Sequence, residues 1–341
     1  MILIKAHHVF NQDNQKRIYS IINQGGLIVF PTETVYGIGA DATNPHAVNS
    51  IFKAKGRPSD NPLIVHLADQ EDLLKYVENI PLYAHTLMAL FWPGPLTLVF
   101  NKKDIIPMEV SGGLDTVGIR IPSSKIAQEV IRASKKPICA PSANISGRPS
   151  STQFEHVLED FNNKVDMMID GGQVDIGLES TVLDLTQHIP VLLRPGAITK
   201  KMIEDALGFT IIDNTEQKIS GIPKSPGMKY THYAPKGKVH LIKGEPDKVK
   251  AYILDRITSL DPMYIGLIAT HDYVDLPFHY AFDLGSLDHL DEVGRHIFQA
   301  LRHMDKLNIT DIFIPALPDQ GLGQAIMNRL LKAAGQSLIE L

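Results

Sequence analysis

Hydrophobic and polar residues alternate along residues 1–208 in a way that predicts helices interleaved with short buried strands. Ile18, Ile21 and Ile22 recur at helical spacing, and Gly25-Gly26 follows as a stop signal. Asn44-Pro45 and Ser123-Ser124 begin two further predicted helices. Predicted strands span 27–30, 63–67, 96–100, 116–121, 165–169, 181–185 and 191–193. Because several strands follow one another directly, we expect a twisted open mixed α/β sheet in an N-terminal domain, residues 1–208.

A more regular pattern begins at Val239. The predicted strands cover 239–242, 263–269 and 311–315, and each precedes a predicted helix, at 246–260, 287–307 and 324–334. Three such β–α steps favour a small Rossmann-like parallel sheet, so residues 239–341 are predicted to form a second α/β domain.

Residues 209–238 between these regions lack a long apolar period and are predicted to be a linker. Within them, 225–235 carry two tyrosines, a histidine and a methionine, which is unusual for a passive linker. This composition suits either a strap packed on one domain or a lid that folds over a site.

Composition narrows the classes of protein that the chain can represent. Among 341 residues the formal net charge is −5, which argues against a protein that mainly coats nucleic acid but leaves weak RNA binding open. Cys139 is the only cysteine, which excludes a disulfide framework and a Cys-rich zinc site. No stretch approaches the roughly 20 apolar residues of a membrane helix. We therefore expect a cytoplasmic protein without a membrane partner.

Several familiar catalytic motifs are absent from the sequence. It contains no G-x-x-x-x-G-K-S/T phosphate loop, no G-x-S-x-G nucleophile elbow and no H-E-x-x-H pair. Gly37-Ile38-Gly39 resembles part of a dinucleotide loop, but its third glycine is missing. Gly321-Leu322-Gly323 is more simply a tight loop before a helix.

A basic cluster stands at the end of the helix that begins at Asn44. Lys53, Lys55 and Arg57 lie within five residues of one another and shortly before Asn61. Cations at a helix C-terminus are favoured by the helix dipole, so capping is one interpretation. The other is a clamp for a triphosphate, with Arg57 binding it through two hydrogen bonds.

Residues 140–150 follow the predicted strand 138–139 and contain small and hydroxyl side chains. Ligands of α/β sheets bind where the carboxyl ends of strands open, which makes Ser142 and Asn144 candidates. Ser150 with Gln153, or Thr152 with Glu155, is also suited to a capping box for the next helix. Cys139 is most simply a buried core thiol.

Arg120 interrupts an apolar strand. A buried arginine needs a carboxylate, which here is either Glu33 or a ligand. Thr34 and Tyr36 lie close to Glu33 in the chain. His66 ends its strand and is either a core histidine or part of the same site.

Six segments of the N-terminal region form one pattern, which in chain order is Phe30-Pro-Thr-Glu-Thr-Val-Tyr-Gly, Lys53-Ala-Lys-Gly-Arg-Pro, Trp92-Pro-Gly-Pro-Leu-Thr, Ala140-Pro-Ser-Ala-Asn, Glu179-Ser-Thr and Leu193-Arg-Pro-Gly. Taken together, these segments resemble the YrdC-like family, the threonylcarbamoyl-AMP synthases. The linker 229–235 and the C-terminal region resemble the longer, two-domain branch of that family.

The resemblance implies an L-threonylcarbamoyladenylate synthase. Such an enzyme makes threonylcarbamoyl-AMP and pyrophosphate from L-threonine, bicarbonate and ATP. Downstream tRNA threonylcarbamoyl transferase proteins then modify an adenosine beside the anticodon. Mg²⁺ is expected to accompany the ATP, but its ligands and any general base stay unassigned.

The resemblance also implies two sets of binding residues. For threonine they are Thr34, His66, Arg120, Ala140 and Ser180. For ATP they are Lys55, Arg57, Asn61, Thr116, Ser142, Asn144, Ser150, Arg194 and Tyr233. Two alternatives remain: an RNA-binding module that uses the same basic concavity without chemistry, and a C-terminal region that acts as a separate nucleotide-binding or regulatory module.

Overall fold

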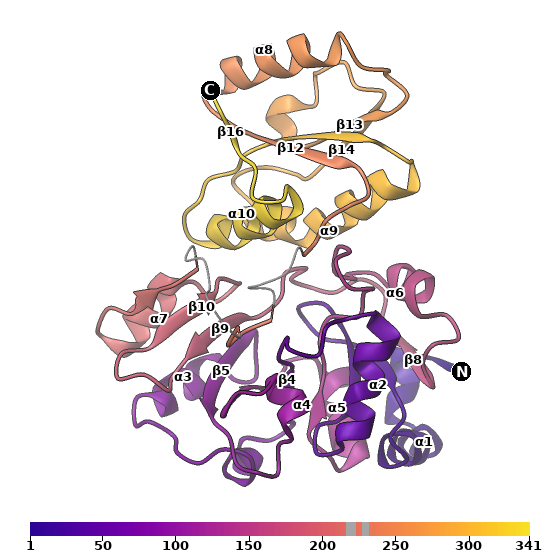
Figure 1. Cartoon of the computed structure of the whole chain (residues 1–341), viewed down its shortest axis with the longest axis vertical. Coiled ribbons are helices and arrows are strands. Elements are labelled where there is room, and N and C mark those ends of the chain that lie inside the picture. Colours follow the sequence, from indigo (N-terminus) through magenta and orange to yellow (C-terminus); the bar gives the residue numbers. More distant parts are fainter. Residues whose placement is uncertain (216–222, 227–231) are drawn as a thin grey trace. The chain divides into compact units, whose positions relative to one another are not determined.

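The computed structural model describes residues 1–215, 223–226 and 232–341 (Figure 1). Their packing defines two compact units. Of the described residues, the first unit holds 1–146, 151–175, 179–215 and 223–226, and the second holds 147–150, 176–178 and 232–341. Residues 216–222 and 227–231 of the predicted linker lie outside the described residues. The domain boundaries at 208 and 238 stay a prediction.

The first unit contains an eleven-stranded mixed sheet, as predicted. Its order is β1-β8-β2-β3-β7-β4-β6-β5-β9-β10-β11. The strands are β1 (Ile2–Lys5), β2 (Ile28–Pro31), β3 (Tyr36–Asp41), β4 (Ile64–His66), β5 (Leu96–Asn101), β6 (Thr116–Arg120), β7 (Ile138–Cys139), β8 (Met167–Asp170), β9 (Thr181–Asp184), β10 (Val191–Arg194) and β11 (Ile212–Asp213). The α-helices are α1 (Gln12–Asn23), α2 (Pro45–Lys55), α3 (Ala84–Phe91), α4 (Met108–Ser111), α5 (Lys125–Ser134), α6 (Phe154–Phe161) and α7 (Lys200–Leu207).

Local sequence signals account for several helix ends. The Asn44 side chain accepts hydrogen bonds from two backbone N–H groups of α2, and Pro45 occupies the first turn. The helix ends at Gly56, whose φ of 63° is left-handed and favours glycine. Ser124 caps α5 as predicted. The proposed capping box at α6 is wrong, because Gln153 is the N-cap residue and makes no side-chain cap hydrogen bond.

The two faces of this sheet bury different groups of residues. One face packs Val65, Ile119, Leu98 and Leu183 into a large core with α2, α3, α4, α6 and α7. On the opposite face, α1 and α5 cover the part that contains β8, β2 and β7.

Farther along that second face lie β4, β6, β5, β9 and β10. There Ile64, Val99, Val182 and Leu193 form a small cluster that includes no helical residue of the described chain. Successive side chains along a strand point to opposite faces of the sheet, so residues two positions away from these four point to the same face as they do. We call this part of the sheet the site face.

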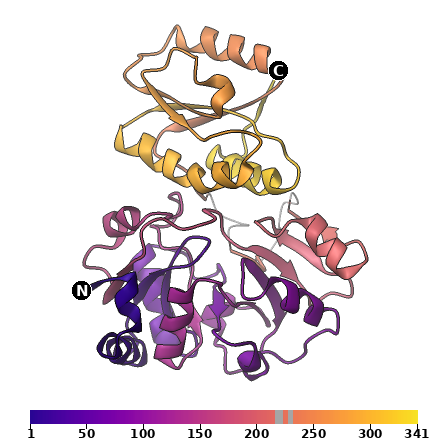
Figure 2. The same cartoon turned by 180° about the vertical axis from the view of Figure 1, so that it is seen from behind.

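The second unit contains a parallel five-stranded sheet of order β14-β13-β15-β12-β16, which confirms the predicted parallel α/β arrangement. Helix α8 covers one face, and α9 and α10 cover the other (Figures 1 and 2). The elements are β12 (Lys238–Lys243), β13 (Ile265–Ala269), β14 (Tyr280–Asp283), β15 (Asp311–Pro315), β16 (Ile339–Glu340), α8 (Pro246–Ile257), α9 (Leu290–Lys306) and α10 (Leu322–Ala333).

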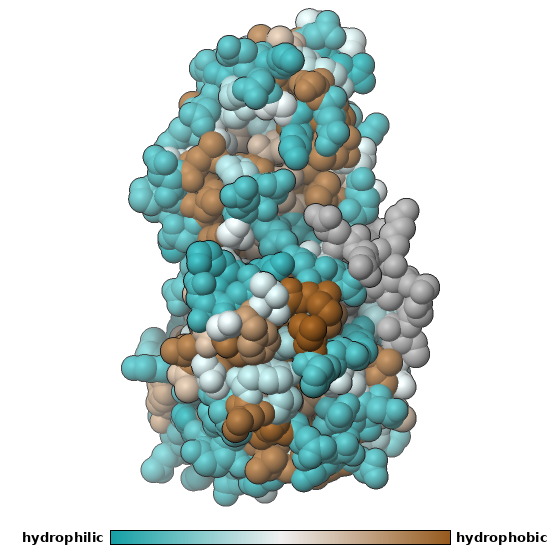
Figure 3. Space-filling model, turned by 90° about the vertical axis from the view of Figure 1, so that its left-hand side faces the viewer, coloured by the Kyte–Doolittle hydropathy of each residue, from teal (hydrophilic) through white to brown (hydrophobic). Residues whose placement is uncertain are grey.

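The surface is mainly hydrophilic on the face seen in Figure 3, where apolar side chains form separate patches. In the part of the chain that the structure describes, no helix is both long and apolar enough to cross a membrane.

Candidate active site

Arg120 ends strand β6 with its guanidinium buried at 4% exposure. It forms an ion pair with Glu33, at 2.6 Å between Nη2 and Oε1. Nη1 donates to Thr34 Oγ1 at 2.9 Å, and Nε donates to the Gly94 carbonyl at 3.2 Å. The protein partner of Arg120 is therefore Glu33, one of the two alternatives that the sequence left open. Three of the five guanidinium N–H groups are used, so two remain for a ligand.

Glu33 and Arg120 share a buried charge pair. Burial raises the pKa of the Glu33 carboxyl, but the charge and hydrogen bond of Arg120 outweigh burial and lower the pKa below its usual value. The second carboxylate oxygen, Oε2, has no partner in hydrogen-bonding geometry among the described residues. Glu33 is therefore ionised near neutral pH and compensates the charge of Arg120.

His66 pairs in register with Arg120 on the neighbouring strand. Complete burial, and then the positive charge of Arg120, lower the pKa of His66 to about 3. The imidazole is therefore neutral at physiological pH. Its Nδ1 atom has no partner in hydrogen-bonding geometry among the described residues. A buried neutral ring beside a cation can accept or donate one hydrogen bond to a small polar ligand.

Thr34 lies in the turn between β2 and β3 and is completely buried. Its hydroxyl contacts the Thr32 hydroxyl at 2.8 Å and also receives the Arg120 hydrogen bond. Tyr36 begins β3, but its hydroxyl donates to the Gly172 carbonyl, so its role is structural. The turn therefore brings the Thr34 hydroxyl and the Glu33 carboxylate to Arg120, and the Thr32 hydroxyl contacts Thr34 behind them.

Ser180 and Arg194, which were assigned to different ligands, are in direct contact. Arg194 donates from Nε to the Ser180 carbonyl and from Nη2 to the Ser180 hydroxyl, both at 3.0 Å. The same hydroxyl contacts Thr97 Oγ1 at 2.7 Å. The predicted threonine and ATP sets therefore meet at this pair. The sequence analysis assigned no role to Thr97; a hydroxyl between Leu96 and Leu98 in a buried strand was the available signal.

Lys55 is the last residue of helix α2, and its side chain is buried. The ammonium donates to the carbonyls of Ser142 and Asn144, the latter at 2.6 Å. The Ser142 hydroxyl donates to Asn144 Oδ1 at 2.6 Å. Ser142 also forms an isolated bridge with Gly37 at the start of β3. These contacts hold residues 142–144 beside the turn that carries Thr34.

Arg57 and Asn61 lie on the turn that follows α2. Arg57 Nη2 donates to the carbonyls of Asn61 and Pro62, at 3.3 and 3.1 Å. Asn61 is buried, and its Oδ1 has no hydrogen-bond partner among the described residues. A buried acceptor of this kind suits a donor on a ligand, such as an adenine amine or a ribose hydroxyl.

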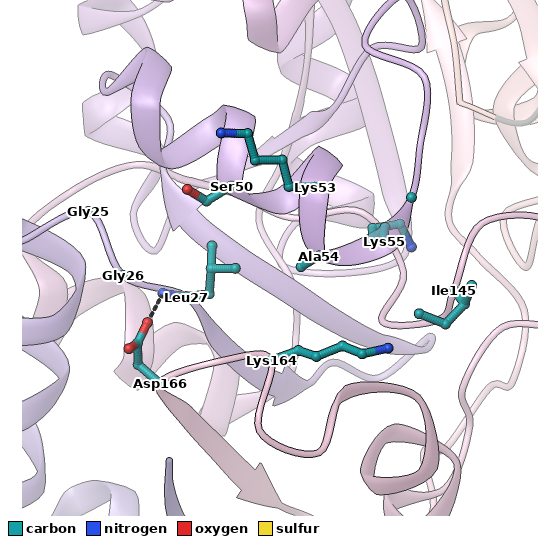
Figure 4. Close-up of a pocket in the computed structure, with 11 residues that line it drawn as sticks. Gly25, Gly26, Leu27, Ser50, Lys53, Ala54, Lys55, Ile145, Lys164 and Asp166 are labelled. Carbon is teal, nitrogen blue, oxygen red and sulfur yellow. Dashed lines mark hydrogen bonds between the residues drawn. The ribbon is translucent and has the colours of Figure 1, made fainter.

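Lys53, the third cation of the basic cluster, is exposed and points away from Lys55 (Figure 4). Both residues line an open pocket of about 740 Å³ that also includes Lys164 and Asp166. The three cations therefore do not converge on one point. Only Lys55 and Arg57 are buried with the predicted site residues.

Thr116 lies at the start of a strand, and Ala140 lies just after the end of one. Thr116 begins β6 and stands on the same face as Arg120, four residues or roughly 13 Å away along the strand. Ala140 follows β7, and its N–H donates to the Ile64 carbonyl at 3.0 Å. The Ala140 amide is therefore already used within the sheet.

Ser150 and Tyr233 belong to the second unit. Both are buried. The Tyr233 ring packs against Phe298 of α9, with ring centroids 5.0 Å apart. Within the predicted lid, Lys229, Tyr230 and Thr231 lie outside the described residues.

Other residues that the sequence analysis discussed have structural positions. Gly37 and Gly39 lie inside β3 and are buried, so they do not form a phosphate loop. The Cys139 thiol is buried, which raises its pKa, as expected for a core thiol. Gly321 precedes α10 in a tight loop.

Comparison with known proteins identifies the family of the chain. Residues 20–196 match the family described as Telomere recombination, and residues 198–335 match the Threonylcarbamoyl-AMP synthase, C-terminal domain. The chain is 46% identical over 322 residues to the threonylcarbamoyl-AMP synthase of Pyrococcus abyssi, covering 94% of this chain and 93% of the relative. The corresponding protein of Bacillus subtilis is 43% identical, with 94% and 92% covered.

A solved structure agrees with these relatives. The crystal structure of P. abyssi Sua5 complexed with L-threonine superposes with a TM-score of 0.93 at 43% identity, covering 100% of this chain and 99% of that chain. Both the fold and the sequence are therefore shared over the whole length. The chain belongs to the threonylcarbamoyl-AMP synthase family, in its two-domain form.

Proposed function

We propose that the chain binds L-threonine through His66, Arg120 and Ser180 on the site face, together with Thr34 and Ala140, and joins it to ATP. The observation that carries this proposal is the Arg120 arrangement. Its charge is balanced by Glu33, yet two of its N–H groups point to no described acceptor. A carboxylate fits two parallel guanidinium donors better than any other ligand group.

We propose that ATP binds next to the threonine. Its residues are Lys55, Arg57, Asn61, Thr116, Ser142, Asn144, Ser150, Arg194 and Tyr233. The contact between Ser180 and Arg194 supports this arrangement, because Arg194 of the ATP set donates to the hydroxyl of Ser180, which belongs to the threonine set. Arg194 would bind phosphate oxygens while it fixes the Ser180 hydroxyl that faces threonine.

The reaction that we infer has two steps. The threonine amine adds to bicarbonate with loss of water, giving a carbamate. A carbamate oxygen then attacks the α-phosphorus of ATP, pyrophosphate leaves with the electron pair of the P–O bond, and threonylcarbamoyl-AMP forms. Carbamates decompose in water, so burial of Thr34, His66 and Arg120 would protect the intermediate. Positioning and charge neutralisation supply most of the catalysis in such transfers.

Mg²⁺ would enter with ATP. Within the described residues, no group of three His, Cys, Asp or Glu side chains is placed to hold a metal ion. We therefore assign no protein ligands to Mg²⁺ and base no step on it. We also propose that the product passes to tRNA threonylcarbamoyl transferase proteins in the cytoplasm, where a lone thiol such as Cys139 stays reduced.

The decisive experiment is mass spectrometry of the product formed from ¹³C-bicarbonate, L-threonine and ATP. We expect threonylcarbamoyl-AMP that carries one ¹³C, and pyrophosphate release only when threonine and bicarbonate are both present. Pyrophosphate release that ignores threonine would contradict the proposal. Binding of RNA with steep salt dependence, without product, would instead support the RNA-binding alternative.

A further inference from the structure

Three chain segments that precede residue 239 belong to the second unit, and each lies against helix α9. They are residues 147–150, 176–178 and 232–236. The first and third segments carry Ser150 and Tyr233, and the second ends two residues before Ser180. These segments are far apart in sequence, so their shared anchor is a property of the fold.

Arg302 of α9 holds the first segment. Its side chain is 1% exposed, and both Nε and Nη2 donate to the Pro149 carbonyl, at 3.0 and 2.8 Å. A fork of two charge-assisted donors on one carbonyl fixes the position of that peptide group. Ser150 is the next residue in the chain.

Asp305, one turn farther along α9, connects the first segment with the third. Its Oδ1 accepts the Lys236 backbone N–H at 2.7 Å, and its Oδ2 lies 3.7 Å from Nη2 of Arg148. The Ala234 N–H donates to the Gly147 carbonyl at 2.9 Å, which joins the two segments directly.

Phe298, Arg302 and Asp305 stand on one face of α9, at i, i+4 and i+7. Phe298 packs on the Tyr233 ring, so one face of α9 contacts Tyr233, Pro149 and Lys236. The second segment packs against the helix backbone. A Cβ at Gly177, whose φ is 79°, would stand 2.4 Å from the Cα of Arg295.

We propose that α9 of the C-terminal unit is a positioning element for nucleotide binding. Arg302 and Asp305 fix the segments that present Ser150 and Tyr233 to ATP. This inference rests on the proposed function for the identity of the ligand. It assigns the C-terminal unit a task within the reaction, in place of a separate regulatory role.

The test compares ligand affinities of full-length variants by calorimetry, with α,β-methylene ATP and L-threonine as separate probes. Arg302→Ala should weaken binding of the nucleotide by about tenfold, the scale of one lost charge-assisted contact. The threonine constant should stay within about twofold, because the contacts that hold Arg120 are made with residues of the first unit. Arg302→Lys keeps the charge and one donor, so its nucleotide affinity should lie between that of the parent chain and that of Arg302→Ala.

The matched control is Ile253→Val on α8, which alters the core on the opposite face of the C-terminal sheet. It should leave both constants unchanged. An Arg302→Ala variant that folds, as judged by its melting curve, and binds the nucleotide normally would overturn the proposal. So would equal loss for both ligands. If Arg302→Ala does not fold, Arg302→Lys decides by the same criteria.

This result is separable from the proposed function. Nucleotide affinity is measured without turnover, so a chain that binds α,β-methylene ATP but yields no labelled product would refute the synthase assignment alone. A chain that makes the product, while Arg302 variants bind the nucleotide normally, would refute only the role of α9.

Discussion

Replacement of Arg120 by alanine should destabilise the first unit strongly, because it leaves the Glu33 carboxylate buried without its cation. Removing one partner of a buried ion pair costs about 3–5 kcal/mol. Domains are typically stable by about 5–15 kcal/mol, so Arg120→Ala would use a large part of the stability.

A second substitution separates charge from packing. Glu33→Gln in the Arg120→Ala background removes the unpaired charge but keeps nearly the same volume. We expect it to recover about 1–3 kcal/mol, the cost of one buried unsatisfied group.

The stability deficit of Arg120→Ala should also depend on pH. In the native chain, burial raises the pKa of Glu33, and Arg120 more than offsets this effect. Without Arg120, burial, which is the largest single influence, is opposed only by two backbone hydrogen bonds, so we expect the folded-state pKa of Glu33 to lie above the unfolded value. Stability from a protonated Glu33 is then present at acid pH and lost as pH rises. The deficit should therefore be smaller at pH 5 than at pH 8.

Urea unfolding followed by Trp92 fluorescence measures this quantity. Trp92 is the only tryptophan, and it is buried in the core of the first unit, so its signal reports on that unit. An Arg120→Ala variant as stable as the parent, or a deficit that Glu33→Gln does not reduce, would refute the electrostatic account of this site.

Three further predictions concern other residues of the candidate site. The folded-state pKa of His66 is lowered to about 3, so the stability that its neutral form gives above pH 6.5 is lost as pH falls. His66→Asn should therefore reduce the pH dependence of the unfolding free energy between pH 6 and 5 by about 1.4 kcal/mol per pH unit, and an unchanged dependence would contradict the neutral, buried state of His66. Arg194→Ala should weaken threonine and ATP binding together, since Arg194 holds Ser180; calorimetry showing loss for ATP alone would disprove the shared role. Tyr233→Ala should raise the apparent ATP dissociation constant severalfold without changing the midpoint of urea unfolding followed by Trp92 fluorescence. Tyr233→Phe, which keeps the ring contact with Phe298, is the control. An unchanged ATP constant in the alanine variant would show that Tyr233 is not part of the ATP site.

Elements with local signals were predictable from the sequence. The side-chain oxygens of Asn44 and Ser124 accept hydrogen bonds from backbone N–H groups two or three residues later in the chain. Such a cap forms within one turn of helix, so it does not depend on distant residues. The regular β–α steps after Val239 likewise determine a parallel sheet through connection geometry.

Features that depend on distant residues were less accessible. Strand β1 (Ile2–Lys5) was not predicted, because its pairing with β8 joins residues about half the chain apart. The capping box at Gln153 failed because the path of residues 147–152 is set by tertiary contacts, including Arg302. Arg302 and Pro149 are separated by 153 residues, and no local pattern connects them.

The candidate site shows the same division. The motifs predict which residues bind the ligands, but only the strand register places His66 beside Arg120, and only the folded chain places Ser180 in contact with Arg194. The choice between Glu33 and a ligand as the partner of Arg120 needed the three-dimensional arrangement, because both agree with the sequence.

A crystal structure of this chain with L-threonine and α,β-methylene ATP bound together would test directly whether the two ligands bind side by side. We expect the threonine carboxylate on Arg120 and the threonine nitrogen roughly 4–5 Å from the α-phosphorus, which leaves room for one carbon and one oxygen between them. Threonine bound away from Arg120, or the two ligands separated by more than that bridge can span, would contradict it.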